Sequence, residues 1–587
     1  MSRANDQTIK NRLSIIPARM LLAQTLLESL MSLMLPRRSF LATGAMAWLC
    51  SPAFAANGML DIALVNARVW TGRRGTFTDA IGLAGNRIAA VGKDAVKAAT
   101  GRRTRIIDLK GAFVMPAFTD CHTHFLRGSE TLSQPVLRDA PDRQAFIDRI
   151  AAAARALPKG QWLLGGQWDE QRWGGELPRR EWIDAVTPDT PVAIPRTDLH
   201  SLFLNSLALK LAGIDRNTPD VEGGVIVRDD KGNPTGILKD NARLPVLDKI
   251  PPMTDEQVAR TIRQGIDYGL SKGVAQVHNT EVDWTTQQAL VRMRARGETG
   301  MRFYSFVPLA DWERMAAFVH DHGRGDDWVR WGAMKCVSDG SLGARTARFH
   351  EEYTDAPGQY GVWSTPVDKM RDWVPAADAA GLAMTVHAIG DEANDVVLEI
   401  MADTVKRNGP RDRRFRIEHA QHLSPGAIAK MKAQGIIASV QPYHAIDDGR
   451  WAVKRIGEER LDRTYAFKSF LDAGVPMCFG SDWPVAPLDP MTGIDAAVRR
   501  QTIDGLNPDG WHPEQRVGIE EAMIAYTATA AYAGFQDDRL GVIAPGYLAD
   551  IVVLDRDLLT APEDSYLTTQ VLRTFVDGKE RYTGSAA

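Results

Sequence analysis

The chain has 587 residues, of which 44% are hydrophobic and 24% charged, which is ordinary for a globular protein and long enough for one large domain and a smaller one. Its 70 basic and 73 acidic residues leave a net charge of −3, so the bulk charge gives no sign of a surface for nucleic acid. No internal repeat is visible. This composition is typical of a soluble enzyme or binding protein.

Residues 1–55 have the features of an export signal. Arg37 and Arg38 form a twin-arginine pair, an apolar stretch follows (ATGAMAWLC), and residues 53–55 (AFA) form a typical cleavage site. We therefore expect export by the twin-arginine machinery and a periplasmic or secreted protein. The alternative is a membrane anchor, but the apolar stretch is too short to cross a bilayer, so no stable membrane insertion is expected after cleavage.

Both ends of the remaining chain are rich in strand-forming residues. Short apolar runs separated by turns lie in 56–113 (LDIALV, RIAAV and RIIDL) and again in 541–587 (DIVVLD and VLRTFV). The long region between them alternates between strand and helix patterns. We predict a small β-sandwich built from both termini, 56–113 and 541–587, flanking a central α/β domain at 114–540.

The central region holds eight strand candidates with helical segments between most of them. This alternation predicts a (β/α)8 barrel of the TIM type. The stretch 125–250 is too long for one strand–helix unit, so we interpret it as an insertion, with a further strand candidate at 191–197. The eight strands are predicted at 114–120, 274–278, 302–307, 332–338, 383–388, 414–419, 435–440 and 475–481, and helices at 257–272, 367–380, 391–407, 425–434 and 460–473.

Three cysteines, Cys121, Cys336 and Cys478, remain after the predicted cleavage, and all three lie in predicted strands. Their odd number argues against a disulfide framework, even in an oxidising compartment. We interpret them as small buried apolar side chains.

The first predicted strand ends in two histidines separated by one residue. In the run VMPAFTDCHTH, His122 and His124 stand at positions whose side chains point to the same side of an extended strand. Two imidazoles offered together can hold a divalent metal. An isolated pair of this kind is more often two ordinary polar residues, so its meaning depends on ligands that arrive later in the chain.

Later strands supply such residues at their ends. His387 ends the run AMTVH, His419 ends FRIEH, and Asp482 ends PMCFGSD. Because the catalytic residues of barrel enzymes gather at the C-terminal ends of the strands, we expect these side chains to converge with the first two histidines. Each of them alone has an ordinary explanation, but the ordered set indicates a metal site.

Lys335 lies within the fourth predicted strand, in the run MKCVSDG. A buried ammonium is costly, so one interpretation is a lysine paired with a carboxylate or reaching solvent. The other is a neutral amine, its pKa lowered by burial and nearby cations, that takes up carbon dioxide as a carbamate. That anion could bridge two metal ions.

The chain resembles the amidohydrolase superfamily, in the branch of N-substituted formamide deformylase-like proteins (amidohydrolase family 3). The resemblance covers most of the mature chain, and its motifs in order are highly specific. It implies a (β/α)8 barrel with a β-sandwich and one or two divalent metals, usually zinc. By position, it implies that His122, His124 and Asp482 hold one metal, and that His387 and His419 hold a second, bridged by carboxylated Lys335. The matching runs are MPAFTDCHTH, RTDLHSLFLNSLAL, KCVSDGSLGARTA, TVHAIGDEAND, RIEHAQ, SVQPYH, FGSDWPVAPLDP and GVIAPGYLADIVVLD.

The chemistry expected of this set is hydrolysis of a C–N bond in a small-molecule amide, N-formyl compound or cyclic amide. A metal-activated hydroxide would attack the carbonyl, with Asp482 as general base and then general acid. An esterase or lactonase on the same centre is the alternative within the fold. A non-catalytic binding protein is a further alternative, disfavoured because every expected ligand is present. The sequence does not indicate the oligomeric state.

Other residues are candidates for contact with the substrate. Asp198 and His200 follow the extra strand of the insertion, in a D-x-H pattern that the resemblance repeats. Trp168, Trp173 and Trp483 are candidates for an aromatic wall, although core packing explains tryptophans equally well. His444, after the seventh strand, could polarise a carbonyl. His278 is interpreted as a wall or supporting residue, and Asp339 and Arg345 as residues that hold the loop after the fourth strand.

Overall fold

The computed structural model describes residues 59–196, 201–221, 224–280, 283–343 and 345–585. The predicted export signal lies outside these residues, as do Asp198 and His200. Within the described residues, no helix has both the length and the apolar character needed to cross a membrane.

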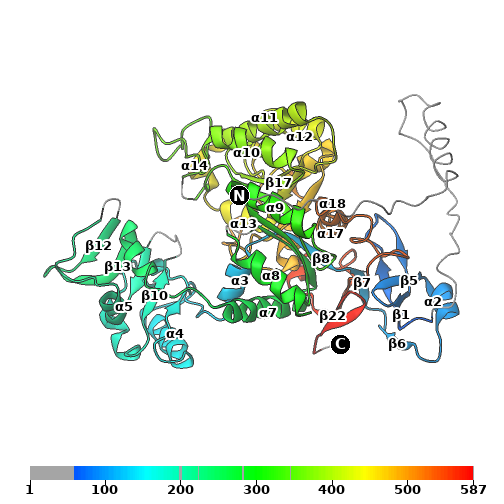
Figure 1. Ribbon diagram of the computed structural model, residues 1–587, viewed down its shortest axis with the longest axis horizontal. Coiled ribbons are helices and arrows are strands. Elements are labelled where there is room, and N and C mark those ends of the chain that lie inside the picture. Colours follow the sequence, from blue (N-terminus) through cyan, green and yellow to red (C-terminus); the bar gives the residue numbers. More distant parts are fainter. Residues whose placement is uncertain (1–58, 197–200, 222–223, 281–282, 344, 586–587) are drawn as a thin grey trace, which may run out of the picture. The chain divides into compact units, whose positions relative to one another are not determined.

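Eight parallel strands form the central sheet, and two of them, β8 and β17, are labelled in Figure 1. The strand order is β20-β19-β18-β17-β16-β15-β14-β8. Two hydrogen bonds join the outer strands just beyond their ends, from Asp482 N to His122 O (2.7 Å) and from His124 N to Trp483 O (2.8 Å). The sheet is therefore a nearly closed barrel, which confirms the predicted fold class. The strands are β8 (Phe118–Thr123), β14 (Val274–Thr280), β15 (Arg302–Pro308), β16 (Val329–Val337), β17 (Ala383–Ala388), β18 (Arg416–His419), β19 (Ile437–Val440) and β20 (Met477–Phe479).

Helices connect successive strands of the barrel. Helix α7 shows why they form: Thr254 and Gln257 make a capping box at its start, and Val258, Ile262 and Ile266 bury one face at helical spacing. The connecting helices include α7 (Asp255–Ser271), α8 (Thr285–Ala295), α9 (Trp312–His322), α10 (Val367–Ala379), α11 (Asp391–Asn408), α12 (Ala427–Gln434) and α15 (Phe467–Ala473). Helix α16 (Pro490–Arg499) follows the last barrel strand, β20. The segment predicted as one helix at 460–473 is a 3-10 helix (Glu458–Arg463) followed by α15.

Two small sheets are built from the chain ends. One has the order β5-β4-β1-β6, and the other, β23-β22-β21-β7-β2-β3, combines strands from both ends. Apolar residues of both sheets share one core, including Leu83 and Ile107 of the first and Val114 and Val553 of the second. This confirms the predicted sandwich, while its domain limits stay predictions. The strands are β1 (Ile62–Val65), β2 (Arg68–Trp70), β3 (Phe77–Thr78), β4 (Ile81–Ala84), β5 (Arg87–Val91), β6 (Arg105–Asp108), β7 (Phe113–Pro116), β21 (Ile551–Leu554), β22 (Val571–Val576) and β23 (Lys579–Thr583). A short helix, α2 (Lys93–Ala99), follows β5.

The single strand predicted at 114–120 is wrong. The run contains parts of two strands: β7 pairs with β2 and β21 in the terminal sheet, and β8 pairs with β14 in the barrel. At the junction, Ala117 N donates to Asp550 O, outside the barrel. One continuous run of the sequence therefore contributes a strand to each of two sheets. No polar break separates the two strands, because both are buried.

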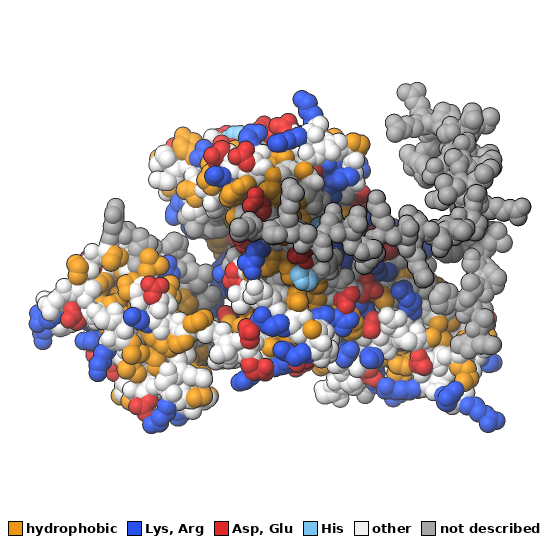
Figure 2. All heavy atoms as spheres, in the orientation of Figure 1, with side chains coloured by type: hydrophobic (Ala, Val, Ile, Leu, Met, Phe, Trp, Pro, Cys, Tyr) orange, Lys and Arg blue, Asp and Glu red, His pale blue; other side chains and the backbone are white. Residues whose placement is uncertain are grey.

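The insertion after β8 has a sheet and cores of its own. Its strands pair in the order β12-β13-β11-β10-β9, and the strand predicted at 191–197 is β10. Its exposed apolar side chains include Leu211, Val225 and Leu247, and Figure 2 shows apolar surface over this part. Its elements are α4 (Arg143–Ala156), β9 (Leu163–Leu164), β10 (Val192–Pro195), β11 (Ser201–Leu204), α5 (Ser206–Leu211), β12 (Gly224–Arg228), β13 (Pro234–Asp240) and α6 (Leu244–Leu247).

The three cysteines are free and buried, on β8, β16 and β20. This confirms their interpretation as buried apolar side chains.

Candidate metal centre

His122 occupies the middle of the site. It is fully buried on β8, and its Nδ1 lies 2.6 Å from Glu418 Oε2. Its Nε2 lies 3.3 Å from Lys335 Nζ and 3.4 Å from Asp482 Oδ1. His124, just after β8, brings its Nε2 to 3.2 Å from the same Asp482 oxygen. Burial, with the charge of Lys335, lowers the pKa of His122 to about 4, so the ring is neutral at pH 7, as a metal ligand must be.

The next pair of histidines stands at the ends of β17 and β18. The ring centroids of His387 and His419 are 4.5 Å apart, and those of His419 and His122 are 5.0 Å apart. His387 Nε2 lies 3.0 Å from Gly340 O. His419 Nδ1 is buried and has no hydrogen-bond partner among the described residues.

Asp482 follows β20 and faces the histidines from the closing edge of the barrel. Burial alone would raise the pKa of this carboxyl, but His122 and His124 outweigh it and hold the pKa well below its ordinary value. Its backbone is left-handed (φ 60°), as is that of His419 (φ 74°). Such conformations are uncommon in residues other than glycine and cluster at functional sites, where the surrounding structure enforces them.

These side chains fit a divalent metal. His122, His419 and Asp482 each offer a ligand atom, and these atoms lie within 4.8 Å of one another. The set is nitrogen and carboxylate oxygen, which suits zinc and also manganese, iron or cobalt. This group combines His122 and Asp482 of the first predicted ligand set with His419 of the second. The remaining histidines lie beside it, His124 next to Asp482 and His387 next to His419.

Lys335 reaches the same cluster from β16. It is 5% exposed, and its Nζ contacts His122 Nε2. Burial lowers its pKa, against the opposing charges of Glu418 and Asp482. The structure therefore places the amine among the histidines rather than in a surface ion pair, and no carboxylate oxygen of the described residues lies within ion-pair distance of it.

Behind the site lies a charged network that the sequence analysis missed. Glu418 accepts hydrogen bonds from His122 Nδ1, from Thr385 Oγ1 and from Arg416 Nη2 (2.6 Å). Arg416 also donates to His278 Nδ1 at 2.8 Å. Burial would raise the pKa of Glu418, but Arg416 and His122 hold it well below its ordinary value. The signal in the sequence was an alternation of polar residues in RIEH, where a buried strand is expected to be apolar.

Asp120 is a second residue that the sequence analysis missed. It is buried on β8, and its Oδ1 accepts hydrogen bonds from the backbone N–H groups of His122 and Ser481 (both 3.0 Å). Burial raises its pKa to about 7. It ties the end of β8 to the segment that carries Asp482.

His444, on α13 (Pro442–Asp448), joins the cluster. Its ring stacks on that of His419 with centroids 6.0 Å apart, and its buried Nε2 lies 3.9 Å from Asp482 Oδ2. This nitrogen has no hydrogen-bond partner among the described residues. The structure thus brings this candidate to the metal ligands.

The tryptophans do not form the predicted wall. Trp168 is fully buried in the core of the insertion, where its Nε1 donates to Ile194 O (3.1 Å), and Trp173 packs in the same core. Trp483 follows Asp482, but its ring packs between Phe125 and Tyr268. Their apolar rings are buried by core packing, the alternative given by the sequence.

The supporting candidates lie around the site. His278 accepts the hydrogen bond from Arg416 described above. Asp339 Oδ2 accepts from Gly390 N (2.9 Å) and Arg348 N (2.8 Å), which holds the loop after β16. Arg345 forms a two-pronged pair with Asp355 on that loop.

Comparisons with known proteins agree with this geometry. The model of the amidohydrolase family matches residues 105–582. The protein LONG AFTER FAR-RED 3 of Arabidopsis thaliana is 36% identical over 89% of this chain and 91% of its own length. The N-substituted formamide deformylase of Arthrobacter pascens is 29% identical over 90% of this chain and 99% of its own. An uncharacterized metal-dependent hydrolase from Pyrococcus furiosus has a crystal structure that matches with a TM-score of 0.72 at 29% identity, covering 85% of this chain and 100% of that one.

Proposed function

This chain belongs to the amidohydrolase family of metal-dependent hydrolases, and we propose that it hydrolyses a C–N bond in a small amide, N-formyl compound or cyclic amide. The observation that carries the proposal is the meeting of His122, His419 and Asp482 at one end of a parallel barrel. The deformylase relative supports N-formyl compounds as the first class of substrate to test.

The ligand set assigns a role to each side chain. One ion would be held by His122, His419 and Asp482, with His124 beside them, and a second by His387, with Lys335 as the bridge if it is carboxylated. A bound divalent metal supplies a water of lowered pKa and polarises the carbonyl of the substrate. Burial lowers the pKa of Lys335, which favours the neutral amine that takes up carbon dioxide.

Asp482 would move the proton in this reaction. Its carboxylate is ionised, so it can accept the proton of the attacking water and then pass it to the departing nitrogen. His444 Nε2 is free of other hydrogen bonds in the described structure and can donate to the carbonyl oxygen as charge develops there.

Asp482→Asn tests the proton transfer. The amide keeps the size of the side chain but cannot accept the proton, so kcat/KM should fall by about 10³-fold, within the range of general acid–base catalysis. Metal content, measured by elemental analysis, should fall much less. Asp462→Asn, an exposed position, is the matched control. Activity of Asp482→Asn near that of the control would contradict the role.

The function itself is tested by metal analysis and a substrate panel. The protein is stripped with a chelator, reloaded with zinc, manganese, iron or cobalt, and assayed on amides, N-formyl compounds, cyclic ureas and esters. We expect at least one metal per chain and metal-dependent cleavage of a C–N substrate. Cleavage of esters alone would favour the esterase alternative, and neither metal nor hydrolysis would overturn the proposal.

We also propose that the protein is exported by the twin-arginine machinery to the periplasm or beyond. The support is the pattern at residues 37–55 alone. N-terminal sequencing of the mature protein is the test, and a mature form that retains Arg37 would contradict it.

A further inference from the structure

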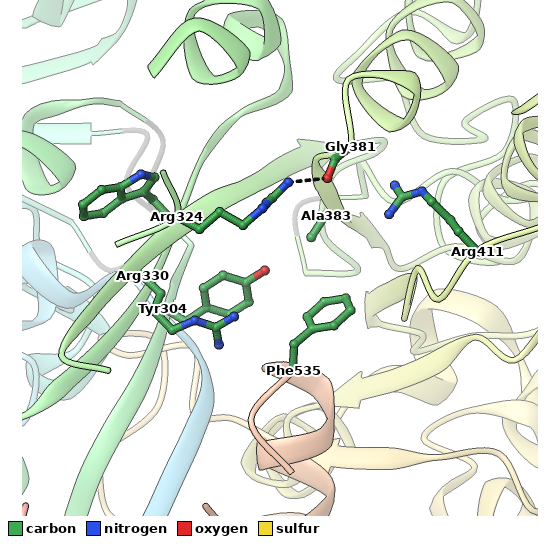
Figure 3. A pocket seen from close by; sticks show the side chains of 8 residues that line it. Tyr304, Arg324, Arg330, Gly381, Ala383, Arg411 and Phe535 are labelled. Carbon is green, nitrogen blue, oxygen red and sulfur yellow. Dashed lines mark hydrogen bonds between the residues drawn. The ribbon is translucent and has the colours of Figure 1, made fainter. Parts of the chain in front are cut away.

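A cavity of about 280 Å³ lies at the opposite end of the barrel from the metal ligands. Three arginines, Arg324, Arg330 and Arg411, and three aromatic residues, Tyr304, Trp331 and Phe535, line it (Figure 3). None of its lining residues is acidic.

The position of this pocket separates it from the candidate metal centre. Arg330 is the second residue of β16, whereas Lys335 is the seventh. At a rise of about 3.3 Å per residue, the five steps from one to the other span about 16 Å along the strand. Tyr304 likewise lies near the start of β15. The pocket is therefore at the N-terminal end of the parallel strands, and a ligand there would not contact the metal ligands.

The positive charge of the pocket is not balanced within it. Arg411 pairs with Asp378, which also holds Arg413. Neither Arg324 nor Arg330 forms an ion pair with any carboxylate of the described residues: Arg324 donates to the carbonyls of Gly332 and Gly381, and Arg330 to that of Gly534.

Asp327, whose negative charge acts on Arg330, forms its ion pair with another arginine. Its Oδ1 lies 3.4 Å from Arg539 Nη1. Burial lowers the pKa of Arg330. Its guanidinium also lies over the ring of Tyr304, with Cζ 4.9 Å from the ring centroid.

The remaining walls indicate the kind of anion. The Tyr304 hydroxyl makes no hydrogen bond with the described residues and stands between the arginines in Figure 3, as a further donor. Trp331 and Phe535 add apolar surface, and a cavity of this volume is larger than an inorganic oxyanion needs. Guanidinium groups prefer carboxylate and phosphate oxygens, and aromatic walls prefer a planar apolar body.

We propose that this arginine pocket binds a small organic anion, an aromatic carboxylate being the chemistry that fits it best. Its carboxylate would lie between Arg324, Arg330 and the Tyr304 hydroxyl, and its ring against Phe535.

Calorimetric titration of the metal-loaded protein tests the proposal, with benzoate as the probe, benzamide as its neutral counterpart and inorganic phosphate as the third ligand. Arg324→Gln removes one exposed charge. Ala383→Leu fills the pocket at the start of β17 and leaves the charges in place. Arg103→Gln, an exposed arginine with no partner among the described residues, is the charge-matched control. Thermal melting shows whether each variant is folded.

We expect saturable binding of about one benzoate per chain, and binding at least about tenfold weaker in both pocket variants but unchanged in Arg103→Gln. Benzamide should bind more weakly than benzoate. Absence of saturable benzoate binding, equal binding by folded pocket variants, equal affinity for benzamide, or binding of phosphate in place of benzoate would each overturn the proposal. Because the readout is binding and not hydrolysis, it is independent of the proposed function.

Discussion

Glu418 links His122, one of the candidate metal ligands, to the interior of the barrel. One carboxylate oxygen accepts from His122 Nδ1 and the other from Arg416 and Thr385. The first contact occupies Nδ1 of His122, so the other ring nitrogen, Nε2, is the one that faces the site. Such carboxylate–histidine pairs orient metal ligands and raise their basicity.

Glu418→Gln should therefore weaken metal binding by about 10- to 100-fold without removing a ligand. The amide keeps the shape but loses the negative charge that faces His122, and it leaves Arg416 without its ion pair. Competition with a chelator measures the affinity. Glu399→Gln, on the exposed face of α11, is the matched control. An affinity equal to that of the control would contradict the supporting role of Glu418.

At this scale, the sequence predicted most of the residues that the structure brings together at the candidate metal centre. The histidines, Lys335 and Asp482 stand at strand ends, where parallel strands place side chains together. Glu418 and Asp120 were missed because the partners that bring them to the site, His122 and Ser481, are distant from them in sequence. For Trp483 the sequence left a pocket wall and core packing open, because the direction of a side chain after a strand end depends on tertiary packing.

At the scale of elements, the joint between β8 and β20 decides the geometry of the site. Gly480 lies where a Cβ would come within 2.6 Å of His122 N and 2.8 Å of His122 Cβ. Only a residue without a side chain lets the two strands approach this closely. The position of His122 relative to Asp482 thus depends on this glycine.

Gly480→Ala should separate the two strands at this point. We expect a loss of stability of about 1–3 kcal/mol, typical of overpacking, and a lower metal content, because His122 is displaced from Asp482. Denaturant unfolding and elemental analysis measure the two effects. At Gly343 a Cβ would make only ordinary contacts, so Gly343→Ala is the control. Normal metal content in a folded Gly480→Ala variant would contradict this account of the joint.

Most of the barrel strands were predictable because they contain apolar runs that are bounded by turns and separated by helical periodicity. The division of 114–120 was not, because both β7 and β8 are buried and no polar residue marks the change of sheet. The insertion was recognisable from its length, but the pairing of its strands is non-sequential and depends on contacts that no local pattern encodes.

At the scale of the whole molecule, a buried arginine joins the barrel to the segments after it in the chain. Arg302 begins β15 and is fully buried. It forms a two-pronged pair with Asp550 (2.6 and 2.9 Å) and contacts Asp577 (3.0 Å), which flank strands of the terminal sheet. The C-terminal strands of the terminal sheet are therefore tied to the barrel through Arg302.

Asp550→Asn should destabilise the protein by about 3 kcal/mol, because it leaves the buried guanidinium of Arg302 with Asp577 as its one ion-pair partner among the described residues. The free energy of unfolding in urea measures the effect. Asp564→Asn, an exposed position on the same terminal segment, is expected to change stability little. Equal stability of the two variants would show that the Arg302–Asp550 pair does not hold the terminal sheet to the barrel.

The most direct test of the metal centre is anomalous diffraction from crystals of the zinc-loaded protein. We expect a strong peak within bonding distance, about 2.0–2.2 Å, of a nitrogen of His122, a nitrogen of His419 and an oxygen of Asp482. A second peak beside His387 and Lys335 would establish a binuclear centre. A fully loaded crystal with its zinc elsewhere, and none between these three side chains, would contradict the account.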